Sequence, residues 1–135
     1  MQRQTGSGKW TTYTVIGIIG TRRRDSEHDY QQTKANFEIV MEDHNLTVDD
    51  TIICSGGCPK GGDRFAEKIA KEYGMPILIH YPRWNTHGKI AGLLRNTEIA
   101  NDSDILMAVV AEDRKGGTED TIKKFDDGKK PLYII

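Results

Sequence analysis

The sequence predicts an α/β fold, a three-layer sandwich in which about five parallel strands lie between two layers of helices. Two observations lead to this prediction. Five short apolar runs, rich in isoleucine and valine, lack the polar–apolar alternation of a half-exposed strand, so strands buried on both faces are expected. Between the runs, apolar residues recur at helical spacing, and strands that alternate with helices are typical of a parallel sheet.

The strands are expected where apolar residues stand together without interruption. Their ranges are Tyr13–Ile19, Thr51–Cys54, Pro76–His80, Asp104–Val110 and Pro131–Ile135. Each run has between four and seven residues, which is an ordinary strand length for a globular protein. The first two runs are followed directly by glycine-containing loops, so they have clear ends.

Four helices are expected between these strands. Their ranges are Tyr30–His44, Arg64–Tyr73, Ala91–Ala100 and Thr118–Phe125. Ser26 or Asp29 can cap the start of the first helix, because short polar side chains accept hydrogen bonds from the free N–H groups there. Gly74, followed two residues later by Pro76, ends the second helix.

The chain of 135 residues is long enough for one domain with a substantial core and too short for two. We place this domain at residues 13–135 and interpret the polar residues 1–12 as a flexible leader. The leader contains Gly6-Ser7-Gly8-Lys9, which has the residue types of a phosphate-binding loop. It precedes the first strand instead of following one, and no Ser or Thr follows the lysine, so we do not interpret it as such a loop.

The composition excludes several classes of function. The net charge is −1, whereas a protein that binds nucleic acid without sequence preference needs surplus Lys and Arg. No apolar run approaches the roughly 18 residues that span a bilayer. The first ten residues lack the apolar region of a secretory signal, so secretion is not expected. Cys54 and Cys58 are too few for a disulfide framework, and no further Cys or His pair stands at zinc spacing. A cytoplasmic protein without a metal or another cofactor is therefore expected.

In an open parallel sheet, ligands bind outside the carboxyl ends of the strands, near the point where the strand order reverses. The loops expected at this edge are 20–29, 55–63, 81–89 and 111–117. Three of them contain glycine turns, at Gly20, at Gly56–Gly62 and at Gly116–Gly117. Such turns leave backbone N–H groups free, and helix N-termini favour negative charge. We therefore expect an anion-binding site at this edge.

Basic residues concentrate on the same loops and on the first turns after them. They are ten of the 19 Lys and Arg residues: Arg22, Arg23, Arg24, Lys60, Arg64, Arg83, Lys89, Arg95, Arg114 and Lys115. Carboxylates partly offset them: Asp25, Glu27, Asp29, Asp63, Glu112 and Asp113. Such a mixed site fits a small anion with a polar remainder, for example a nucleotide, better than a long polyanion.

Three features of this edge have structural alternatives. Glycine turns and loop charges occur in every doubly wound protein, so one loop alone does not indicate a ligand. Trp84 is either a stacking platform for a base or an apolar plug over the third strand. Asp63 either orients a ligand or caps the helix that follows it.

Several short motifs at this edge follow one another in a characteristic order. They are Gly20-Thr21-Arg22, Ser55-Gly56-Gly57, Gly62-Asp63, Arg83-Trp84, Gly88, Ala91-Gly92, Arg95-Asn96 and Gly117-Thr118. In this order and spacing the chain resembles the YspA-type (cpYpsA-related) branch of the SLOG superfamily, which is related to the Lonely Guy phosphoribohydrolases and to DNA-processing protein A. The similarity covers nearly the whole chain from about Tyr13 to Ile135.

The resemblance implies a Rossmann-like fold, a homodimer, and a nucleotide or nucleotide-derived ligand at the glycine loops. It implies that Arg22 and Arg95 meet phosphate or ribose, and that Asn96 and Asp63 orient the site. An Arg fork and a helix N-terminus, here at Gly117-Thr118, are groups that a phosphate needs. The ligand-binding candidates are Gly20, Thr21, Arg22, Ser55, Gly56, Gly57, Gly61, Gly62, Asp63, Trp84, Arg95, Asn96, Gly116, Gly117 and Thr118.

Two departures from the family pattern bear on function. The glycine loop, with Cys58-Pro59-Lys60 between Gly57 and Gly61, is one residue longer than the usual form. The phosphoribohydrolases carry a catalytic glutamate three residues after the motif threonine, and in this chain that position is Thr121. Because cleavage of a glycosidic bond needs a positioned acid or carboxylate, the departure favours binding over turnover.

The favoured function is capture of a nucleotide or a signalling derivative, as a sensor or a sequestering module. The alternative is a nucleotide hydrolase of the N-glycosidase or phosphoribohydrolase type, for which Asp63, Glu119 and Arg95 are the candidate catalytic residues. A DNA-binding role is the weakest hypothesis, because the net charge is balanced and the chain lacks a long basic stripe.

Overall fold

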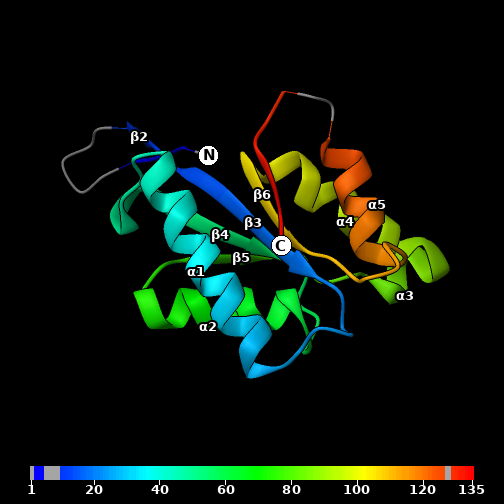
Figure 1. The fold of residues 1–135 in the computed structure, drawn as a ribbon. Coiled ribbons are helices and arrows are strands. Elements are labelled where there is room, and N and C mark those ends of the chain that lie inside the picture. Colours follow the sequence, from blue (N-terminus) through cyan, green and yellow to red (C-terminus); the bar gives the residue numbers. More distant parts are fainter. Residues whose placement is uncertain (1, 5–9, 127–128) are drawn as a thin grey trace.

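A computed structural model describes residues 2–4, 10–126 and 129–135 of the chain. It confirms the predicted α/β fold, with one sheet of five parallel strands between two layers of helices (Figure 1). The strands of this sheet are β3 (Thr14–Gly20), β4 (Thr51–Ser55), β5 (Ile77–Ile79), β6 (Ile105–Val109) and β7 (Leu132–Ile134). Every strand end lies within one residue of the expected position.

The strand order in the sheet is β5-β4-β3-β6-β7. β3 comes first in sequence and lies in the middle of this sheet. β4 and then β5 extend the sheet on one side of β3, and β6 and then β7 extend it on the other. The register places Ile16 of β3 beside Ile53 of β4 and Ile105 of β6. The strand order reverses at β3, so its carboxyl end is where an open α/β sheet binds ligands.

Two long helices cover each face of the sheet. They are α1 (Glu27–Asp43) and α2 (Gly62–Tyr73) on one face and α4 (Ala91–Asp102) and α5 (Gly117–Phe125) on the other. Tyr30, Phe37 and Phe65 pack into the core on the α1–α2 side. Ile99 and Phe125 belong to a second core on the α4–α5 side. The sheet is therefore buried on both faces, as its unbroken apolar runs predicted.

Local signals explain the helix ends. Ser26 is the N-cap of α1 and forms a capping box with Asp29, so both predicted capping residues take part. This cap starts α1 three residues earlier than the apolar pattern alone suggested. Gly74 ends α2 with a left-handed φ of 65°, as predicted.

Short elements complete the chain. They are the helix α3 (Trp84–His87), the 3₁₀ turns η1 (Val48–Asp50) and η2 (Gly88–Ile90), and the strands β1 (Gln2–Gln4) and β2 (Trp10–Thr12). β1 and β2 pair in antiparallel fashion within the segment that we interpreted as a leader. Its Gly6-Ser7-Gly8-Lys9 sequence lies outside the described residues. No helix in the described ranges is both long and apolar enough to cross a bilayer.

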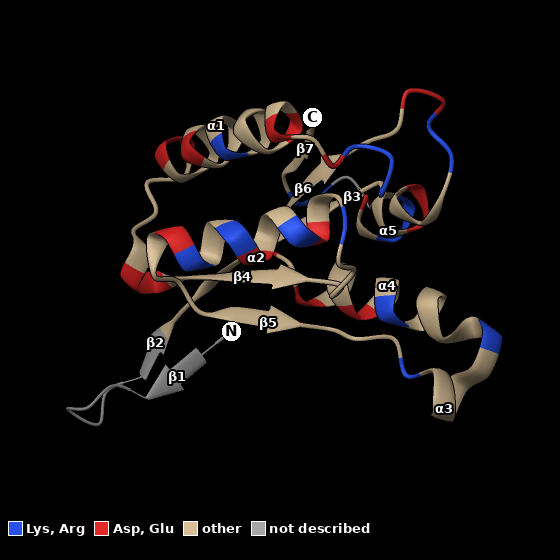
Figure 2. Cartoon of the chain, turned by 90° about the horizontal axis from the view of Figure 1, so that it is seen from below, with Lys and Arg blue, Asp and Glu red and all other residues tan. Residues whose placement is uncertain are grey.

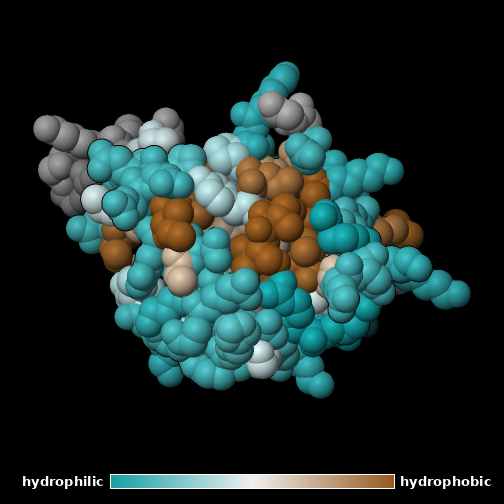
Figure 3. Space-filling view, in the orientation of Figure 1, coloured by the Kyte–Doolittle hydropathy of each residue, from teal (hydrophilic) through white to brown (hydrophobic). Residues whose placement is uncertain are grey.

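The sheet has an open edge at β7. Figure 3 shows apolar residues gathered at the surface between α1 and α5, over this strand. Ile134 is exposed there, whereas Leu132 and Tyr133 are partly buried. The functional residues predicted from sequence lie elsewhere, at the carboxyl ends of the strands.

Candidate functional site

The carboxyl edge of the sheet holds a cleft of about 410 Å³, a volume within the range of roughly 300–1,000 Å³ that is usual for small-molecule sites. Nine of the residues predicted to bind a ligand line it: Gly20, Thr21, Arg22, Asp63, Arg95, Asn96, Gly116, Gly117 and Thr118. Six further residues complete the lining: Ile19, Arg23, Cys58, Ile99, Lys115 and Thr121. The loops after β3, β4 and β6 and one side of α4 therefore share one cleft.

Seven predicted site residues lie outside this lining. They are Ser55, Gly56, Gly57, Gly61, Gly62, Trp84 and Glu119. Most of them belong to the loop between β4 and α2, which supports the cleft from behind. The structure gives each of these residues a contact within the protein itself.

The two glycines at the start of α2 are required by the close approach of this helix to β3. A Cβ atom on Gly62 would lie 2.1 Å from the carbonyl carbon of Ile19, and a Cβ on Gly61 would lie 2.3 Å from the carbonyl oxygen of Thr21. Gly61 also has a φ of 75°. No side chain fits between two backbones at such distances. The end of β3, and not a ligand, accounts for these glycines.

The earlier part of the same loop is held by side chains. Gly57 has a φ of 77°, and a Cβ there would lie 2.6 Å from the Tyr81 ring. A Cβ on Gly56 would lie 2.7 Å from Nη1 of Arg95. The Ser55 hydroxyl is buried and donates to the Asp63 carbonyl oxygen at 3.3 Å. The loop is therefore a compact support with little room for a ligand.

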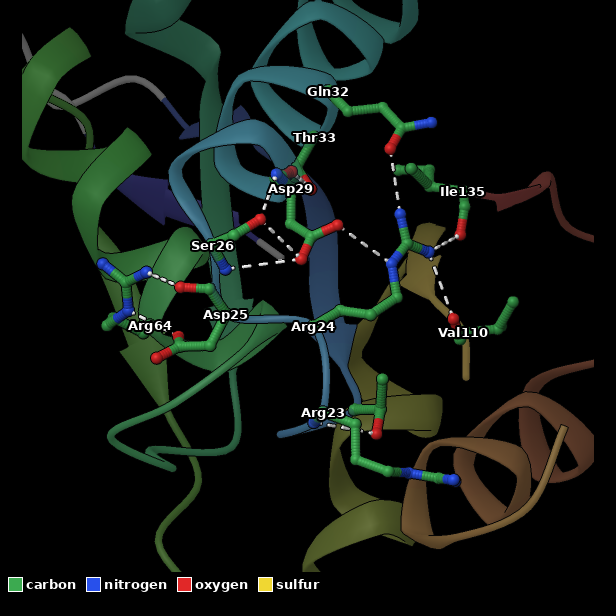
Figure 4. Close-up of polar contacts among 11 residues, drawn as sticks. Arg23, Arg24, Asp25, Ser26, Asp29, Gln32, Thr33, Arg64, Val110 and Ile135 are labelled. Atoms are coloured by element: carbon green, nitrogen blue, oxygen red, sulfur yellow. Dashed lines mark hydrogen bonds and ion pairs between the residues drawn. The ribbon is translucent and has the colours of Figure 1, made fainter. Parts of the chain in front are cut away.

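Asp25, in the β3–α1 loop, binds the last part of the β4–α2 loop and the first turn of α2 (Figure 4). Its Oδ1 accepts hydrogen bonds of 2.7 Å from the Gly61 N–H group and from Nε of Arg64. The Gly61 bond, followed by the Arg64 bond, lowers the pKa of the Asp25 carboxyl. Asp25 and Arg64 therefore connect the β3–α1 loop to the start of α2.

Arg24, although basic and near the cleft, is partly buried and bonded to other parts of the fold (Figure 4). Its guanidinium donates to side chains of α1 and to carbonyl oxygens near the ends of β6 and β7: Asp29, Gln32, Val110 and Ile135. Its charge is compensated by Asp29 at 3.2 Å. Arg24 therefore fastens the first loop to the far edge of the sheet and adds no free charge to the cleft.

Asp63 is a buried carboxyl group within the cleft lining. It is 7% exposed, and its Oδ2 accepts a hydrogen bond of 3.0 Å from the Cys58 N–H group. It does not cap α2, because the N-cap is Gly61 and has no side-chain hydrogen bond. Burial raises the pKa of the Asp63 carboxyl, although the Cys58 N–H group and the Arg95 charge act against this.

Arg95 and Asn96 connect three elements around the cleft. Nη1 of Arg95 donates to the Gly56 carbonyl at 2.6 Å, and its Nε donates to Oδ1 of Asn96 at 2.9 Å. Nδ2 of Asn96 donates to the Gly117 carbonyl at 3.3 Å and to Asp120 at 3.1 Å. Through these bonds α4 fixes the β4–α2 loop relative to the start of α5.

Four cationic side chains line the cleft, and they differ in what neutralises them. Arg23 forms two bonds of 2.8 Å to Asp113, and Arg95 is bonded as described above. The exposed side chains of Arg22 and Lys115 have no hydrogen bond or ion pair within residues 2–4, 10–126 and 129–135. Two positive charges of the cleft therefore have no acidic partner among the described residues.

The start of α5 adds free backbone donors beside these charges. Gly116 is its N-cap with a φ of 119°, and, its chain neighbours apart, no described residue has an atom within 4 Å of the place where its Cβ would stand. The N–H groups of Gly116, Gly117 and Thr118 have no hydrogen-bond partner in the described part of the chain. Figure 2 shows acidic and basic segments next to each other in the loop that leads into α5. A helix start of this kind attracts anions.

Two predicted site residues, Glu119 and Trp84, make contacts outside the cleft lining. Glu119 binds Arg114 through two bonds of 2.9 Å. Trp84, on α3, is 58% exposed, and its Cη2 would lie 3.6 Å from a Cβ on Gly92 of α4. Thr121, which occupies the position of the family's glutamate, does line the cleft and is 2% exposed.

The lining also includes residues that the sequence did not single out as ligand-binding. Lys115 carries the clearest signal in retrospect, because it directly precedes the Gly116-Gly117 turn at a helix start. Cys58 and Arg23 stand in loops already expected at this edge. Ile19 and Ile99 reach the lining because β3 and α4 pack together, and nothing in the sequence marks them as site residues.

Within the described ranges, no group of three or more His, Cys, Asp or Glu side chains is arranged to hold a metal ion. No protein-family model matches this chain, and neither the curated proteins nor the solved structures contain a match to it.

Proposed function

We propose that the cleft binds a nucleotide or a nucleotide-derived small molecule, with a phosphate group at the N-terminus of α5. The observation that carries this proposal is the pair of uncompensated charges, Arg22 and Lys115, in one cleft with the free N–H groups of Gly116–Thr118. Charged donors and oriented backbone N–H groups are what phosphate oxygens bind most strongly. Membership of the SLOG superfamily, based on the sequence motifs, is part of this proposal.

The rest of the cleft favours a ligand with a polar remainder. Asp63 and Asn96 are buried in its lining beside Arg95. A carboxyl and an amide at this depth can accept hydrogen bonds from the hydroxyl groups of a sugar. Among the described residues, Ile19 and Ile99 are the large apolar side chains of the lining, so the cleft offers one limited apolar contact for a base.

Hydrolysis of the ligand is the second candidate function. It is favoured by the burial of the Asp63 carboxyl in the cleft lining. A buried carboxyl with a raised pKa is suited to act as a general acid. Glu119 does not strengthen this candidate, since it is paired with Arg114 and lies outside the lining. Binding without turnover remains the favoured function.

A thermal-shift screen with adenosine, adenosine mono-, di- and triphosphate, cyclic nucleotides and dinucleotides tests the proposal. A phosphate-bearing ligand at 100 times its Kd adds about 2.7 kcal/mol to the free energy of unfolding, which raises the Tm measurably. The unphosphorylated nucleoside is expected to give a much smaller shift. A panel in which no phosphorylated ligand raises the Tm contradicts the proposal.

Chromatography of the bound ligand after overnight incubation separates the two candidate functions. Intact ligand is expected for a binding module, whereas free base or released phosphate indicates the hydrolase. Should product appear, the Asp63→Asn variant decides whether Asp63 supplies the proton, because an amide cannot act as a general acid. Product formation at an unchanged rate in this variant would exclude Asp63 from catalysis.

The Lys115→Ala variant tests the phosphate position directly. A hydrogen bond to a charged group contributes about 1.5–3 kcal/mol, so the affinity for a phosphorylated ligand should fall about 10- to 100-fold. Lys123→Ala is the matched control, because it removes the same charge from the exposed last turn of α5, outside the cleft lining. Equal losses in both variants would mean that net charge, and not the position of Lys115, governs binding.

A further inference from the structure

A second feature of the molecule, independent of the cleft, is a groove at the C-terminal ends of α1 and α2. In Figure 1 these helix ends lie where the strands of the sheet begin, on the side away from the cleft. The groove has a volume of about 320 Å³. Five of the residues that line it are apolar or aromatic: Phe37, Met41, Leu46, Val48 and Tyr73. We call this feature the α1–α2 groove.

The α1–α2 groove reaches down to the hydrophobic core. Phe37 is 1% exposed and belongs to the core on this side of the sheet, while Met41, Leu46 and Tyr73 are partly buried against that core. The centroids of the Phe37 and Tyr73 rings lie 5.2 Å apart. Because burial of apolar area is favourable, an apolar side chain from outside would be stabilised in contact with these residues.

The charged residues around the groove are acidic. Glu38 and Glu42 line it, and Asp49 directly follows a lining residue of the η1 turn. Residues 35–59 contain five carboxylates and no Lys or Arg. Glu38 accepts a hydrogen bond from the Tyr73 hydroxyl, whereas the exposed side chains of Glu42 and Asp49 have no bond or ion pair within the part of the chain that the structure describes. Figure 2 shows acidic segments at this end of α1 and in the turn that leads into β4.

The position of Glu42 on α1 is electrostatically unfavourable. The C-terminal end of a helix carries partial negative charge, so cations stabilise it and carboxylates do not. The last turn of α1 contains Glu42 and Asp43 but no basic residue. A local arrangement that costs stability is expected where function requires it. This end of α1 therefore lacks a cation that a binding partner can supply.

We propose that the α1–α2 groove binds a basic amphipathic segment of a partner protein, with an apolar side chain in the groove and a Lys or Arg beside Glu42. An apolar groove with an acidic rim is complementary to such a segment, and amphipathic helices commonly bind grooves in this way. Anionic lipids and nucleic acids would be repelled by the same carboxylates. Among the described residues the groove and the cleft share no lining residue, so this proposal does not depend on a nucleotide ligand.

Titration of ¹⁵N-labelled protein with three synthetic peptides tests the proposal. The first is an amphipathic helix of Leu and Lys, the second replaces Lys by Glu, and the third replaces Leu by Ser. Only the first should bind with a micromolar Kd, and it should shift the amide signals of residues 37–48 and Tyr73. No binding of this peptide, equal binding of the acidic peptide, or shifts confined to another surface would overturn the proposal.

A charge reversal separates the groove from the net charge of the protein. Glu42→Lys should weaken binding of the Leu and Lys peptide about tenfold or more, because like charges then meet. The same variant should raise the Tm of the free protein, since a cation is favourable at the end of α1. Glu112→Lys, at an exposed position in the β6–α5 loop, is the matched control and should bind as the wild type does. Equal losses of affinity in the two variants contradict a specific site.

Val48→Ser tests the apolar contact. It should weaken binding of the same peptide about fivefold, because it removes apolar area from the groove. Leu94→Ser is the control, since Val48 and Leu94 are both 36% exposed and Leu94 lies on α4. Unchanged affinity in Val48→Ser overturns the proposal. Sedimentation equilibrium covers the other occupant: a wild-type dimer that Val48→Ser dissociates would assign the groove to a second copy of the chain instead.

Discussion

In the loop between β4 and α2 the glycines meet the protein's own backbone, whereas in the loop between β6 and α5 they meet open space. Gly61 and Gly62 would each bring a Cβ within 2.3 Å of the end of β3 or the residue that follows it. Gly116, on the same edge of the sheet, has no atom of the described residues within 4 Å of its Cβ position, apart from its own and its chain neighbours'. Both loops are rich in glycine, but only the second leaves room for a ligand.

The difference shows that a glycine loop at the carboxyl edge of a sheet is not in itself a ligand site. The β4–α2 loop needs glycine so that α2 can approach β3, and Asp25 then fixes it in place. The β6–α5 loop needs glycine for its backbone conformation, and the N–H groups of Gly116, Gly117 and Thr118 at the start of α5 have no partner among the described residues. The first loop therefore contributes stability, and we assign phosphate binding to the second.

Gly62→Ala should give the largest effect on stability. Its Cβ would lie 2.1 Å from backbone atoms of Ile19, which cannot move without displacing β3. Overpacking of a core costs about 1–3 kcal/mol and sometimes more, and this contact belongs at the upper end. Urea denaturation should show a loss of about 3 kcal/mol or more.

Gly92→Ala is the control for this substitution. It also changes a helical glycine to alanine, but its Cβ has only ordinary contact with Trp84. The free energy of unfolding should stay level or rise by up to about 1 kcal/mol. If both variants lost the same free energy of unfolding, the close approach of α2 to β3 would not explain why position 62 needs glycine.

Gly116→Ala should have an intermediate effect on stability and a large one on binding. Its φ of 119° and ψ of −171° lie in a region that other residues avoid, at a cost of about 1–3 kcal/mol. Because the new Cβ enters open space, no clash adds to this cost. Denaturation should therefore show a smaller loss than Gly62→Ala, while calorimetry should show weaker binding of phosphorylated ligands. Unchanged affinity would separate Gly116 from the site.

Asp63→Asn should stabilise the protein at neutral pH. Burial raises the native pKa of Asp63 above the unfolded value near 3.8, so the native state holds the proton more tightly. The stability from this group is full below pH 3.8 and is lost as the pH rises through the native pKa. The Tm of Asp63→Asn should therefore exceed that of the wild type at pH 7, and the two should converge near pH 3. A variant that is less stable at pH 7 would contradict this.

Asp25→Asn should give the smallest change, with the opposite pH dependence. Bonds from Gly61 and Arg64 lower the native pKa of Asp25, so its contribution is present above the unfolded pKa and is lost as the pH falls through the native one. The side chain is 34% exposed, which limits the loss at pH 7 to about 1 kcal/mol or less. Thermal melts at pH 7 and pH 2 should show the difference between variant and wild type shrinking in acid.

The sequence predicted the fold well because buried strands and helix caps have local signals. Unbroken isoleucine and valine runs located all five parallel strands, and Ser26, Asp29 and Gly74 marked helix ends as predicted. The helix α3 and the turn η2 had no comparable signal, because Trp84–Ile90 shows neither periodicity nor a capping residue.

The candidate site was harder to predict from the sequence than the fold, because its charge depends on which basic residues form hydrogen bonds and ion pairs within the protein. In sequence, Arg24 and Lys115 are equivalent basic residues in edge loops. In the structure, Arg24 binds Asp29 and three carbonyl or amide oxygens, while Lys115 has no partner in the described part of the chain. Such pairings join residues up to about a hundred positions apart, and spacing does not reveal them.

The most direct test of the phosphate position is an NMR titration of ¹⁵N-labelled protein with adenosine 5′-monophosphate, inorganic phosphate and adenosine. The amide signals of Gly116, Gly117 and Thr118 should shift with the two phosphate-bearing compounds and move little with adenosine. Phosphate-dependent shifts confined to the loop of Gly56–Gly62, or no shifts at the start of α5, would contradict it.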